Sequence, residues 1–487
     1  MQQMGSPLSR RPNKPVEEAR KAAPEVRPAN APPSPPAPEK PVEEARGYVP
    51  PPKRRTTPRV AELRRQLRPK LLAAPNEADE WQRDNPEHQK IIVDRLNIFL
   101  QRANLQLPKP EYEELREALL DDILGWGAID PLIRDRSYSE IMVNGPDIIF
   151  AERKGKLIET EYVFDDEEHA DWVAQKIVRR LMRRFDREHP MTDARLPDGS
   201  RVHLVRRPSA LQGITMTIRK FPEKVLTVQD LIRFGSMTQE VADFLQACIV
   251  ARLNIVVAGG TGSGKTTLLN VLSSFIPEDE RIVTIEDAAE LQLTQRHVVR
   301  LETAPPVPGA KDGTGQLTIR DLVRGSLRMR PDRIVIGECR GGEALDMLQA
   351  MNTGHDGSLT TIHANSPRDA IARLETLALM AGVDLPVNVV RRQIASAIQL
   401  IIQQARLKDG SRKIVQISEI QGMEGDSIVM QDLFVYRTPD HKGPGPSHTG
   451  GGTLQPTGYR TKFSERFEQA GFKLSAKIFG SGAGGRA

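Results

Sequence analysis

The chain has 487 residues, of which 38% are hydrophobic and 27% are charged. At roughly 150 residues per domain, this length allows about three structural units and excludes a minimal peptide-like module. Lysine and arginine (69) exceed aspartate and glutamate (64) by only 5 charges, an excess that does not by itself indicate a nucleic-acid partner, so no direct nucleic-acid binding is expected.

Cysteine content and hydropathy indicate where in the cell the protein is located. The only cysteines, Cys248 and Cys339, cannot form a four-thiolate zinc site, and so low a count fits a reducing compartment better than a disulfide-bonded secreted domain. No apolar run approaches the roughly 18 to 20 residues that span a bilayer, and the first residues lack the apolar stretch of a signal peptide. We therefore expect a cytoplasmic protein whose association with a membrane runs through a partner.

The first 58 residues differ in composition from the rest of the chain. They contain 15 of the 37 prolines and no isoleucine, phenylalanine or tryptophan, so they cannot bury enough apolar surface to offset the loss of chain entropy. We predict a disordered Pro-rich tail over residues 1–58. The segment KPVEEAR occurs twice in it, at 14–20 and 40–46, either as part of a solvated spacer or as a docking motif.

Two folded regions are predicted after the tail. Over residues 59–107 apolar side chains recur at helical spacing, which predicts a small helical bundle; they are Val60, Leu63, Leu67, Ile91, Ile92, Leu96, Phe99 and Leu100. Residues 108–225 begin with a helical pattern and continue with strands, two of them around Asn144-Gly145-Pro146 and others around the turn Pro197-Asp198-Gly199. This second region predicts an α+β N-terminal domain.

Residues 226–437 alternate short apolar strands with helices. The strand segments are NIVVAG, RIVTIED, RIVIGE and SLTTIHA. Apolar strands separated by helices predict an α/β fold, a parallel sheet with helices on both faces. Residues 438–487 form a Gly/Pro-rich C-terminal segment whose end, GSGAGGRA, we expect to be frayed.

One motif in the α/β region indicates phosphate binding. The pattern G-x-x-x-x-G-K-[ST] occurs in full between a predicted strand and a predicted helix, which is the context that a phosphate-binding loop requires. In such a loop backbone N–H groups face the phosphates, the lysine reaches the β and γ phosphates, and the final hydroxyl holds Mg²⁺. The predicted nucleotide-binding residues are Gly259, Gly260, Thr261, Gly262, Ser263, Gly264, Lys265, Thr266 and Thr267.

The nucleotide is predicted to be ATP, bound with Mg²⁺. A GTP-binding protein would need an Asn-Lys-x-Asp motif after a strand. The only Asn-Lys pair, Asn13-Lys14, lies in the predicted tail and lacks the aspartate.

Acidic residues follow two of the predicted strands. Glu286, Asp287 and Glu290 come at and just past the end of one strand, and Glu338 ends another. Carboxylates at the carboxyl ends of strands face the crevice where an open α/β sheet binds its ligand. The predicted Mg²⁺ ligands are therefore the carboxylates of Asp287 and Glu338, together with the hydroxyl of Thr266 in the phosphate loop. Gly337 stands where an aspartate is usual, and helix caps or surface charges are the alternative interpretation of these acids.

Two histidines flank another predicted strand. His355 and His363 are eight residues apart, which does not match the compact H-x₃₋₅-H spacing of a zinc site. They are either sensors of the γ-phosphate or of a subunit interface, or two structural histidines.

Four segments in this order, GGTGSGKTT, TIEDAAEL, RPDRIVIGECRGGEA and TGHDGSLTTIHAN, resemble the ATPases of type II and type IV secretion and pilus systems. The resemblance covers about 108–437 and implies a hexameric motor with a RecA-like ATPase domain. It also implies that Glu290 polarises the attacking water, that Glu338 is the Walker B carboxylate, and that His355 and His363 form the family's His box.

The preceding region resembles the N-terminal domain of these ATPases through IMVNGPD, ARLPDGSRVH and ITMTIRKF. The resemblance implies that Arg201 and Arg219 close on the nucleotide phosphates, with Arg195 as a weaker candidate. Exposed strand arginines on a solvated face are the alternative. Residues 226–238 are short enough to act as a hinge between this domain and the phosphate loop.

Within the superfamily, the sequence most resembles the CpaF/TadA group, the motors of tight-adherence (Tad/Flp) pili. Two cysteines cannot build the zinc insert common in other pilus and type II secretion motors. The resemblance implies a homohexamer that docks on an inner-membrane platform protein at the cytoplasmic face and drives pilin assembly or retraction. The alternatives are a conjugation-type ATPase that moves a DNA–protein substrate and a non-catalytic ring held together by nucleotide.

Overall fold

The computed structural model describes residues 50–480 except 75, 154, 181–183, 222–224, 307–313, 442 and 444. Its contacts divide the chain into Met1–Pro51 and Pro52–Ala487, and every element named below belongs to the second unit. The KPVEEAR repeat and residues 481–487 of the predicted frayed end lie outside the described residues. Among the helices that the structure describes, none is long and apolar enough to cross a membrane.

The first elements form a helical bundle: α1 (Pro58–Leu67), the 3-10 turn η1 (Arg68–Lys70), α2 (Pro86–Arg102) and α3 (Lys109–Ile123). They share one apolar core, to which Val60, Leu67 and Leu96 contribute. Leu115 and Leu119 of α3 lie in the same core because residues four apart lie on one face of a helix. The bundle therefore includes α3, which the sequence pattern assigns to the following domain.

Part of the predicted tail also contacts the fold. Lys53 Nζ lies 2.6 Å from Glu159 Oε1, and Thr56 Oγ1 donates to Asp165 at 2.6 Å. Arg54 N–H donates to the carbonyl oxygen of Glu161 at 2.8 Å. Basic and polar groups here find acidic partners in the α+β region, so the described fold begins before the predicted boundary at residue 58.

The next elements form a six-stranded antiparallel sheet with the order β3-β2-β1-β6-β5-β4. The strands are β1 (Tyr138–Asn144), β2 (Ile149–Arg153), β3 (Lys156–Glu159), β4 (Met191–Arg195), β5 (Arg201–Val205) and β6 (Thr215–Arg219). The two strands predicted around Asn144-Gly145-Pro146 are β1 and β2, and β3 follows where the sequence pattern predicts no separate strand.

Helices pack against this sheet. The turn η2 (Gly127–Ile129) and α4 (Asp130–Arg134) lead from the bundle into β1. Helix α5 (Glu167–Arg179) begins after Asp166, whose carboxylate accepts a hydrogen bond from the backbone N–H of His169. Val173 and Ile177 of α5 lie in the apolar core of the sheet.

The remaining strands form a nine-stranded sheet with the order β15-β14-β13-β12-β7-β11-β10-β8-β9. The run from β12 to β9 is parallel, and β13 to β15 are antiparallel. The strands are β7 (Ile255–Gly259), β8 (Ile282–Glu286), β9 (Val298–Glu302), β10 (Arg333–Cys339), β11 (Leu359–His363), β12 (Leu400–Arg406), β13 (Arg412–Glu424), β14 (Ser427–Arg437) and β15 (Thr453–Pro456).

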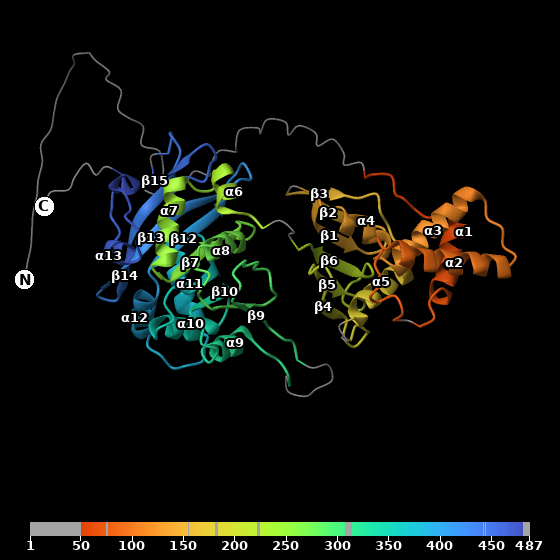
Figure 1. The fold of residues 1–487 in the computed structure, drawn as a ribbon, viewed down its shortest axis with the longest axis horizontal. Coiled ribbons are helices and arrows are strands. Elements are labelled where there is room, and N and C mark those ends of the chain that lie inside the picture. Colours follow the sequence, from red (N-terminus) through yellow and green to blue (C-terminus); the bar gives the residue numbers. More distant parts are fainter. Residues whose placement is uncertain are drawn as a thin grey trace, which may run out of the picture. The chain divides into compact units, whose positions relative to one another are not determined.

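Helices cover both faces of this sheet (Figure 1). Ile255 and Val257 of β7 belong to one apolar core and Val256 and Ala258 to a second, because successive side chains of a strand point to opposite faces. The first core includes α7 (Gln239–Val250) and α8 (Lys265–Ser273); the second includes α9 (Ile319–Ser326), α10 (Glu343–Asn352), α11 (Pro367–Leu379) and α12 (Val387–Ala397). The predicted fold class, an α/β domain with helices on both faces of a parallel sheet, preceded by an α+β region, is confirmed.

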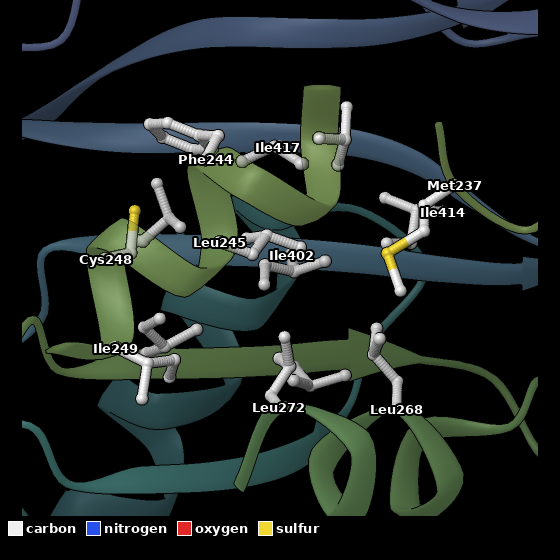
Figure 2. Close-up of a cluster of buried hydrophobic side chains, with 14 of the residues drawn as sticks. Met237, Phe244, Leu245, Cys248, Ile249, Leu268, Leu272, Ile402, Ile414 and Ile417 are labelled. Carbon is white, nitrogen blue, oxygen red and sulfur yellow. The ribbon is translucent and has the colours of Figure 1, made fainter. Parts of the chain in front are cut away.

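Figure 2 shows part of the first core. Phe244, Leu245 and Ile249 of α7 lie among apolar side chains of α8, β12 and β13, including Leu268 and Ile402. The helix α6 (Val228–Arg233) precedes α7 and is closed at its start by a reciprocal capping box between Thr227 and Asp230. The segment predicted as a hinge, residues 226–238, therefore contains a helix.

The Gly/Pro-rich region from 438 to 480 contributes to the same core. It contains β15, the helix α13 (Ser464–Gln469) and the 3-10 turn η3 (Ala476–Phe479). The rings of Phe467 and Phe479 pack edge-on against Phe244 of α7, with centroids 6.0 and 5.7 Å apart. A few widely spaced aromatic residues anchor this segment to the core. The glycine and proline content of the segment does not predict this packing.

Candidate nucleotide-binding site

The phosphate loop connects the end of β7 to the start of α8, the context predicted from the sequence. Gly264 precedes the helix with φ of 95°, a conformation that glycine adopts without steric cost. Gly259 has no room for a side chain, since a Cβ there would meet the carbonyl oxygen of Gln404. Ser263 Oγ donates to the carbonyl oxygen of Gly260 at 2.8 Å. The loop therefore presents the first N–H groups of α8 to an anion.

Lys265 lies in the first turn of α8 and is buried. Its Nζ donates to the carbonyl oxygen of Gly260 at 3.1 Å and lies 3.3 Å from His363 Nε2. Burial lowers the pKa of Lys265, and the nearby Glu338 carboxylate opposes this shift. Lys265 forms no ion pair with any residue that the structure describes, so its ammonium can turn to a phosphate without breaking one.

Charged side chains from the ends of three neighbouring strands converge beside the loop. Glu338 of β10 places Oε1 3.4 Å from His363 Nε2, and its Oε2 accepts a hydrogen bond from Arg340 at 2.6 Å. Arg340 also donates to Asp287, just past β8, at 3.1 Å. Together with Lys265 these residues form a continuous chain of contacts, which we call the strand-end cluster (Lys265, His363, Glu338, Arg340 and Asp287).

Two further groups of this cluster, besides Lys265, have shifted pKa values. Hydrogen bonding to Glu338 is the largest of the effects that raise the pKa of Arg340. Burial, followed by the charge of Lys265, lowers the pKa of His363, so the imidazole is neutral near pH 7. Sequence reasoning does not find Arg340, because a single arginine after a strand matches no motif. The one sequence feature that could have identified Arg340 is its position two residues after Glu338.

Glu286, the last residue of β8, organises the turn that carries Glu290. Its Oε2 accepts hydrogen bonds from the backbone N–H groups of Glu290 at 2.8 Å and Leu291 at 3.0 Å. Burial raises the pKa of Glu286. A Cβ on Gly337 would lie 2.9 Å from Glu286 Cγ, so a side chain at 337 would displace Glu286.

The predicted arginines divide into two sets. Arg201 donates to Glu290 Oε1 at 2.8 Å and to the carbonyl oxygen of Ala288 at 2.9 Å, and Arg219 lies 3.4 Å from the same Glu290 oxygen. Arg195 instead pairs with Glu302 at 3.0 Å. The structure therefore brings Arg201 and Arg219 to Glu290 and leaves Arg195 apart from it.

A cavity of 360 Å³ lies beside the phosphate loop. Thr266 and Thr267 of α8 line it, together with Arg201, Arg219 and Glu290. Its position next to the start of α8 and its size fit part of a nucleotide.

The two predicted histidines lie at opposite ends of β11. His363 is aligned with Gly259 at the phosphate-loop end of the sheet, whereas Leu359 is aligned with Ile255 at the other end. His355 precedes Leu359 and places Nδ1 3.3 Å from the carbonyl oxygen of Ala350. Within the described chain His355 and His363 are therefore not brought together, and only His363 joins the strand-end cluster.

The oxygen atoms present fit a Mg²⁺ ion bound with a nucleotide. Oε1 of Glu338 is buried and accepts no hydrogen bond from the described residues, and oxygen is the ligand that Mg²⁺ prefers. Thr266 and Glu338 would hold the ion. Asp287, the third predicted ligand, is paired with Arg340 and would contribute only after releasing it.

Comparison with known proteins identifies the family. The family model described as type II/IV secretion system protein matches residues 123–429, more than half of the chain. The chain belongs to this family. The phosphate loop, the strand-end cluster and the arginines that contact Glu290 all lie within the matched range.

The matches to three related proteins cover most of the length of each of those proteins. A Mycobacterium tuberculosis protein whose name assigns it to conjugal transfer is 35% identical over 313 residues, which is 63% of this chain and 88% of that protein. The conjugal transfer protein TrbB of Rhizobium radiobacter is 34% identical over 291 residues, 59% of this chain and 85% of TrbB. The crystal structure of the VirB11 ATPase from the Brucella suis type IV secretion system, in complex with sulphate, is 31% identical, covers 60% of this chain and 92% of its own, and has a TM-score of 0.33.

Proposed function

We propose that this protein hydrolyses ATP with Mg²⁺ and uses the energy to drive a secretion or pilus machine from the cytoplasmic side of a membrane. The strand-end cluster is the observation that supports this proposal most. It links Lys265 of the phosphate loop to Glu338 through His363 within contacts of 3.3 and 3.4 Å. The cluster therefore sets a phosphate-binding cation beside a carboxylate with an open oxygen, as phosphoryl transfer requires.

The contacts of Glu290 suggest how phosphate binding and water activation are connected. Arg201 and Arg219 both contact the Glu290 carboxylate, which neutralises the group proposed to polarise the attacking water. A bound γ-phosphate competes for the same guanidinium groups. When the arginines turn to the phosphate, Glu290 is released to accept a hydrogen bond from water, so one event both stabilises the phosphate charge and activates the base.

The proposed assembly is a homohexamer. The family resemblance supports a hexamer. A second support is that the residues of the site come from two sheets, the six-stranded sheet with its arginines and the nine-stranded sheet with the phosphate loop. His355, at the far end of β11 from the loop, is free in this arrangement to act at a neighbour's surface. Light scattering with Mg²⁺ and a non-hydrolysed ATP analogue is expected to give about six chains per particle, and a strict monomer at micromolar concentrations would contradict the motor.

We propose that the machine is a Tad/Flp-type pilus whose inner-membrane platform protein docks the ATPase. The helical bundle before the α+β region and the two-cysteine composition, which cannot form a zinc insert, support this choice. The second candidate is a conjugation-type ATPase that moves a DNA–protein substrate, which the names of the two curated relatives favour. Deleting the gene in its source organism and scoring surface pili and DNA transfer separately distinguishes the two.

The test of hydrolysis is phosphate release by the full chain with Mg²⁺ and with chelator. Lys265→Ala removes the ammonium beside the phosphates and is expected to abolish both nucleotide binding and turnover. Lys408→Ala, at an exposed position in the turn between β12 and β13, is expected to behave as wild type. Nucleotide binding without turnover by the wild-type chain, with platform protein present, would indicate a nucleotide-held scaffold ring instead.

A further inference from the structure

The hairpin between β12 and β13 contacts both the phosphate loop and the segment that precedes α7. Arg412 Nε donates to the carbonyl oxygen of Gly262 in the loop at 3.0 Å. The next residue, Lys413, donates through Nζ to the carbonyl oxygens of Phe234 and Gly235, each at 2.8 Å. Because neighbouring residues of a strand point to opposite sides, Arg412 contacts the phosphate loop while Lys413 contacts the segment before α7.

The hairpin holds residues 234–236 at four points. Besides the two bonds from Lys413, Ser236 Oγ donates to the carbonyl oxygen of Arg412 at 2.6 Å, and the N–H of Ile414 donates to the carbonyl oxygen of Ser236 at 3.0 Å. The ammonium lies at the C-terminal end of α6, where a cation is favourable. Gly235 has φ of 62°, and a Cβ there would lie 2.9 Å from Lys413 Nζ. The positive φ therefore favours glycine at 235, and a side chain there would displace the Lys413 ammonium.

On its other side the hairpin lies against the phosphate loop. Gln404 of β12 is aligned with Gly259 of β7, and a Cβ on Gly264 would lie 3.3 Å from Arg412 Cδ and 3.4 Å from Gln404 Nε2. Arg412 forms no ion pair with any described residue, so its guanidinium serves the loop carbonyl alone. The backbone at the apex of the loop is thus held by a side chain that the phosphate-loop motif does not include.

We propose that Arg412 and Lys413 couple residues 234–236 to the phosphate loop, with Arg412 as a positioning residue for nucleotide binding. This inference rests on the proposed binding of nucleotide at the loop. Residues 234–236 lie between β6, which ends with Arg219, and α7. A shift of this segment therefore moves the hairpin and the loop together. By linkage, bound nucleotide also stabilises the segment to the same extent.

The coupling is tested by the affinity for Mg-ADP, measured by calorimetry on the full chain. Arg412→Ala is expected to weaken binding about tenfold, since a charge-assisted hydrogen bond to the loop is lost. Lys413→Met keeps the apolar stem but loses both bonds to 234 and 235, and it is expected to weaken binding about threefold although Lys413 does not touch the loop. Lys408→Met, in the turn of the same hairpin and exposed, is the matched control and should bind as wild type.

Non-additivity distinguishes coupling from two local effects. Because the effect of Lys413 runs through Arg412, the double variant should bind no more weakly than Arg412→Ala alone. Ser236→Ala, which keeps Lys413, should weaken binding in the same direction and guards against a Lys413 variant that fails to fold. Wild-type affinity in Lys413→Met and Ser236→Ala with a lowered melting temperature would overturn the coupling and leave a purely stabilising contact. A wild-type chain that binds no ADP would instead overturn the proposed function.

Discussion

Two groups of charged side chains in this protein differ in how completely their atoms are bonded. Both oxygens of Asp122 are occupied, by Arg64, His169 and Arg68, and all four residues are buried. In the strand-end cluster, Oε1 of Glu338 accepts no hydrogen bond from the described residues, and its contact with His363 is 3.4 Å long. The carboxylate of the first group is therefore fully bonded, although Arg68 Nε beside it has no partner among the described residues, whereas the carboxylate of the second group has an open oxygen.

Lys176 extends the closed group. Its Nζ donates to the carbonyl oxygens of Asp122, Ile123 and Gly125 at 2.7 Å each, and it lies near the rings of Trp126 and Trp172. Together with the bonds between Arg64 and Asp122, these contacts join α1, α3 and α5, which are distant in sequence. The difference between the groups teaches that buried charge alone does not mark a site. A closed network fixes architecture, whereas an open oxygen beside a phosphate loop is available to a ligand.

The largest effect that would sharpen this comparison is expected at Arg201. Arg201→Ala should bind Mg-ADP nearly as wild type and lose about 10³ in turnover, as arginines that act on a transferred phosphate do in other P-loop enzymes. Arg219→Ala should lose less, because its contact with Glu290 is longer and it lacks the bond to Ala288. Steady-state phosphate release measures both.

Arg195→Ala is the matched control for these arginines, since Arg195 pairs with Glu302 rather than Glu290. Its turnover should stay within about twofold of wild type. Equal losses in all three variants would mean that the arginines act on the sheet as a whole. Mixed rings of Arg201→Ala and Lys265→Ala subunits should remain inactive if each arginine serves its own chain.

The next effect is expected at the open position itself. Glu338→Gln removes the negative charge but keeps the size, so the variant should retain nucleotide and lose about 10² in turnover, with an unchanged melting temperature. Asp287→Asn, which alters the outer end of the cluster, should lose less. A fall in stability for Glu338→Gln would place Glu338 in the same class as Asp122 and break the comparison.

In the closed group the expected effect is on stability. Asp122→Ala leaves two arginines and a histidine buried without their carboxylate, and should lower the free energy of unfolding by about 3 to 5 kcal/mol. The three tryptophans of the chain, Trp81, Trp126 and Trp172, all lie in this region, so fluorescence during urea unfolding reports on it directly. Asp94→Ala, at an exposed position of α2, should change stability by no more than about 0.5 kcal/mol.

The effect that is smallest for each step of the measurement is a dependence of stability on pH. Burial lowers the pKa of Lys176 to about 7 in the folded chain, whereas an unfolded lysine titrates near 10.4. Between these values the unfolded state binds more protons, so stability should rise with pH from about 7 to 10, by up to roughly 1.4 kcal/mol per pH unit. Lys176→Met should flatten that rise. The same slope in the variant would assign the pH dependence to other groups.

The sequence predicts those parts of the site that lie close together in the chain. The phosphate loop is one continuous motif between a strand and a helix, and Glu286 and Glu338 lie at the carboxyl ends of strands whose apolar pattern is plain. Neighbouring parallel strands end at one edge of a sheet, so their convergence follows from the fold class. Only the family resemblance predicts a role for Arg201 and Arg219, because nothing in their own spacing indicates a contact with Glu290.

Contacts between distant residues could not be predicted in this way. Asp122 meets Arg64 and His169, which are 58 and 47 residues away, and no local pattern records such a pairing. Arg412 and Gly262 are 150 residues apart. The placement of His355 away from His363 depends on which end of β11 each occupies, and a spacing of eight residues does not determine whether the chain turns or runs straight between them.

The aromatic packing on α7 has a consequence for how the protein folds as it is made. Phe244 is synthesised long before Phe467 and Phe479, the rings that cover it. The same holds for β7, whose parallel neighbour β12 is made much later. On the ribosome the bundle and the six-stranded sheet can therefore be complete while α7 still exposes an apolar face, so a chaperone that shields such faces would act on this protein mainly during synthesis of its second half.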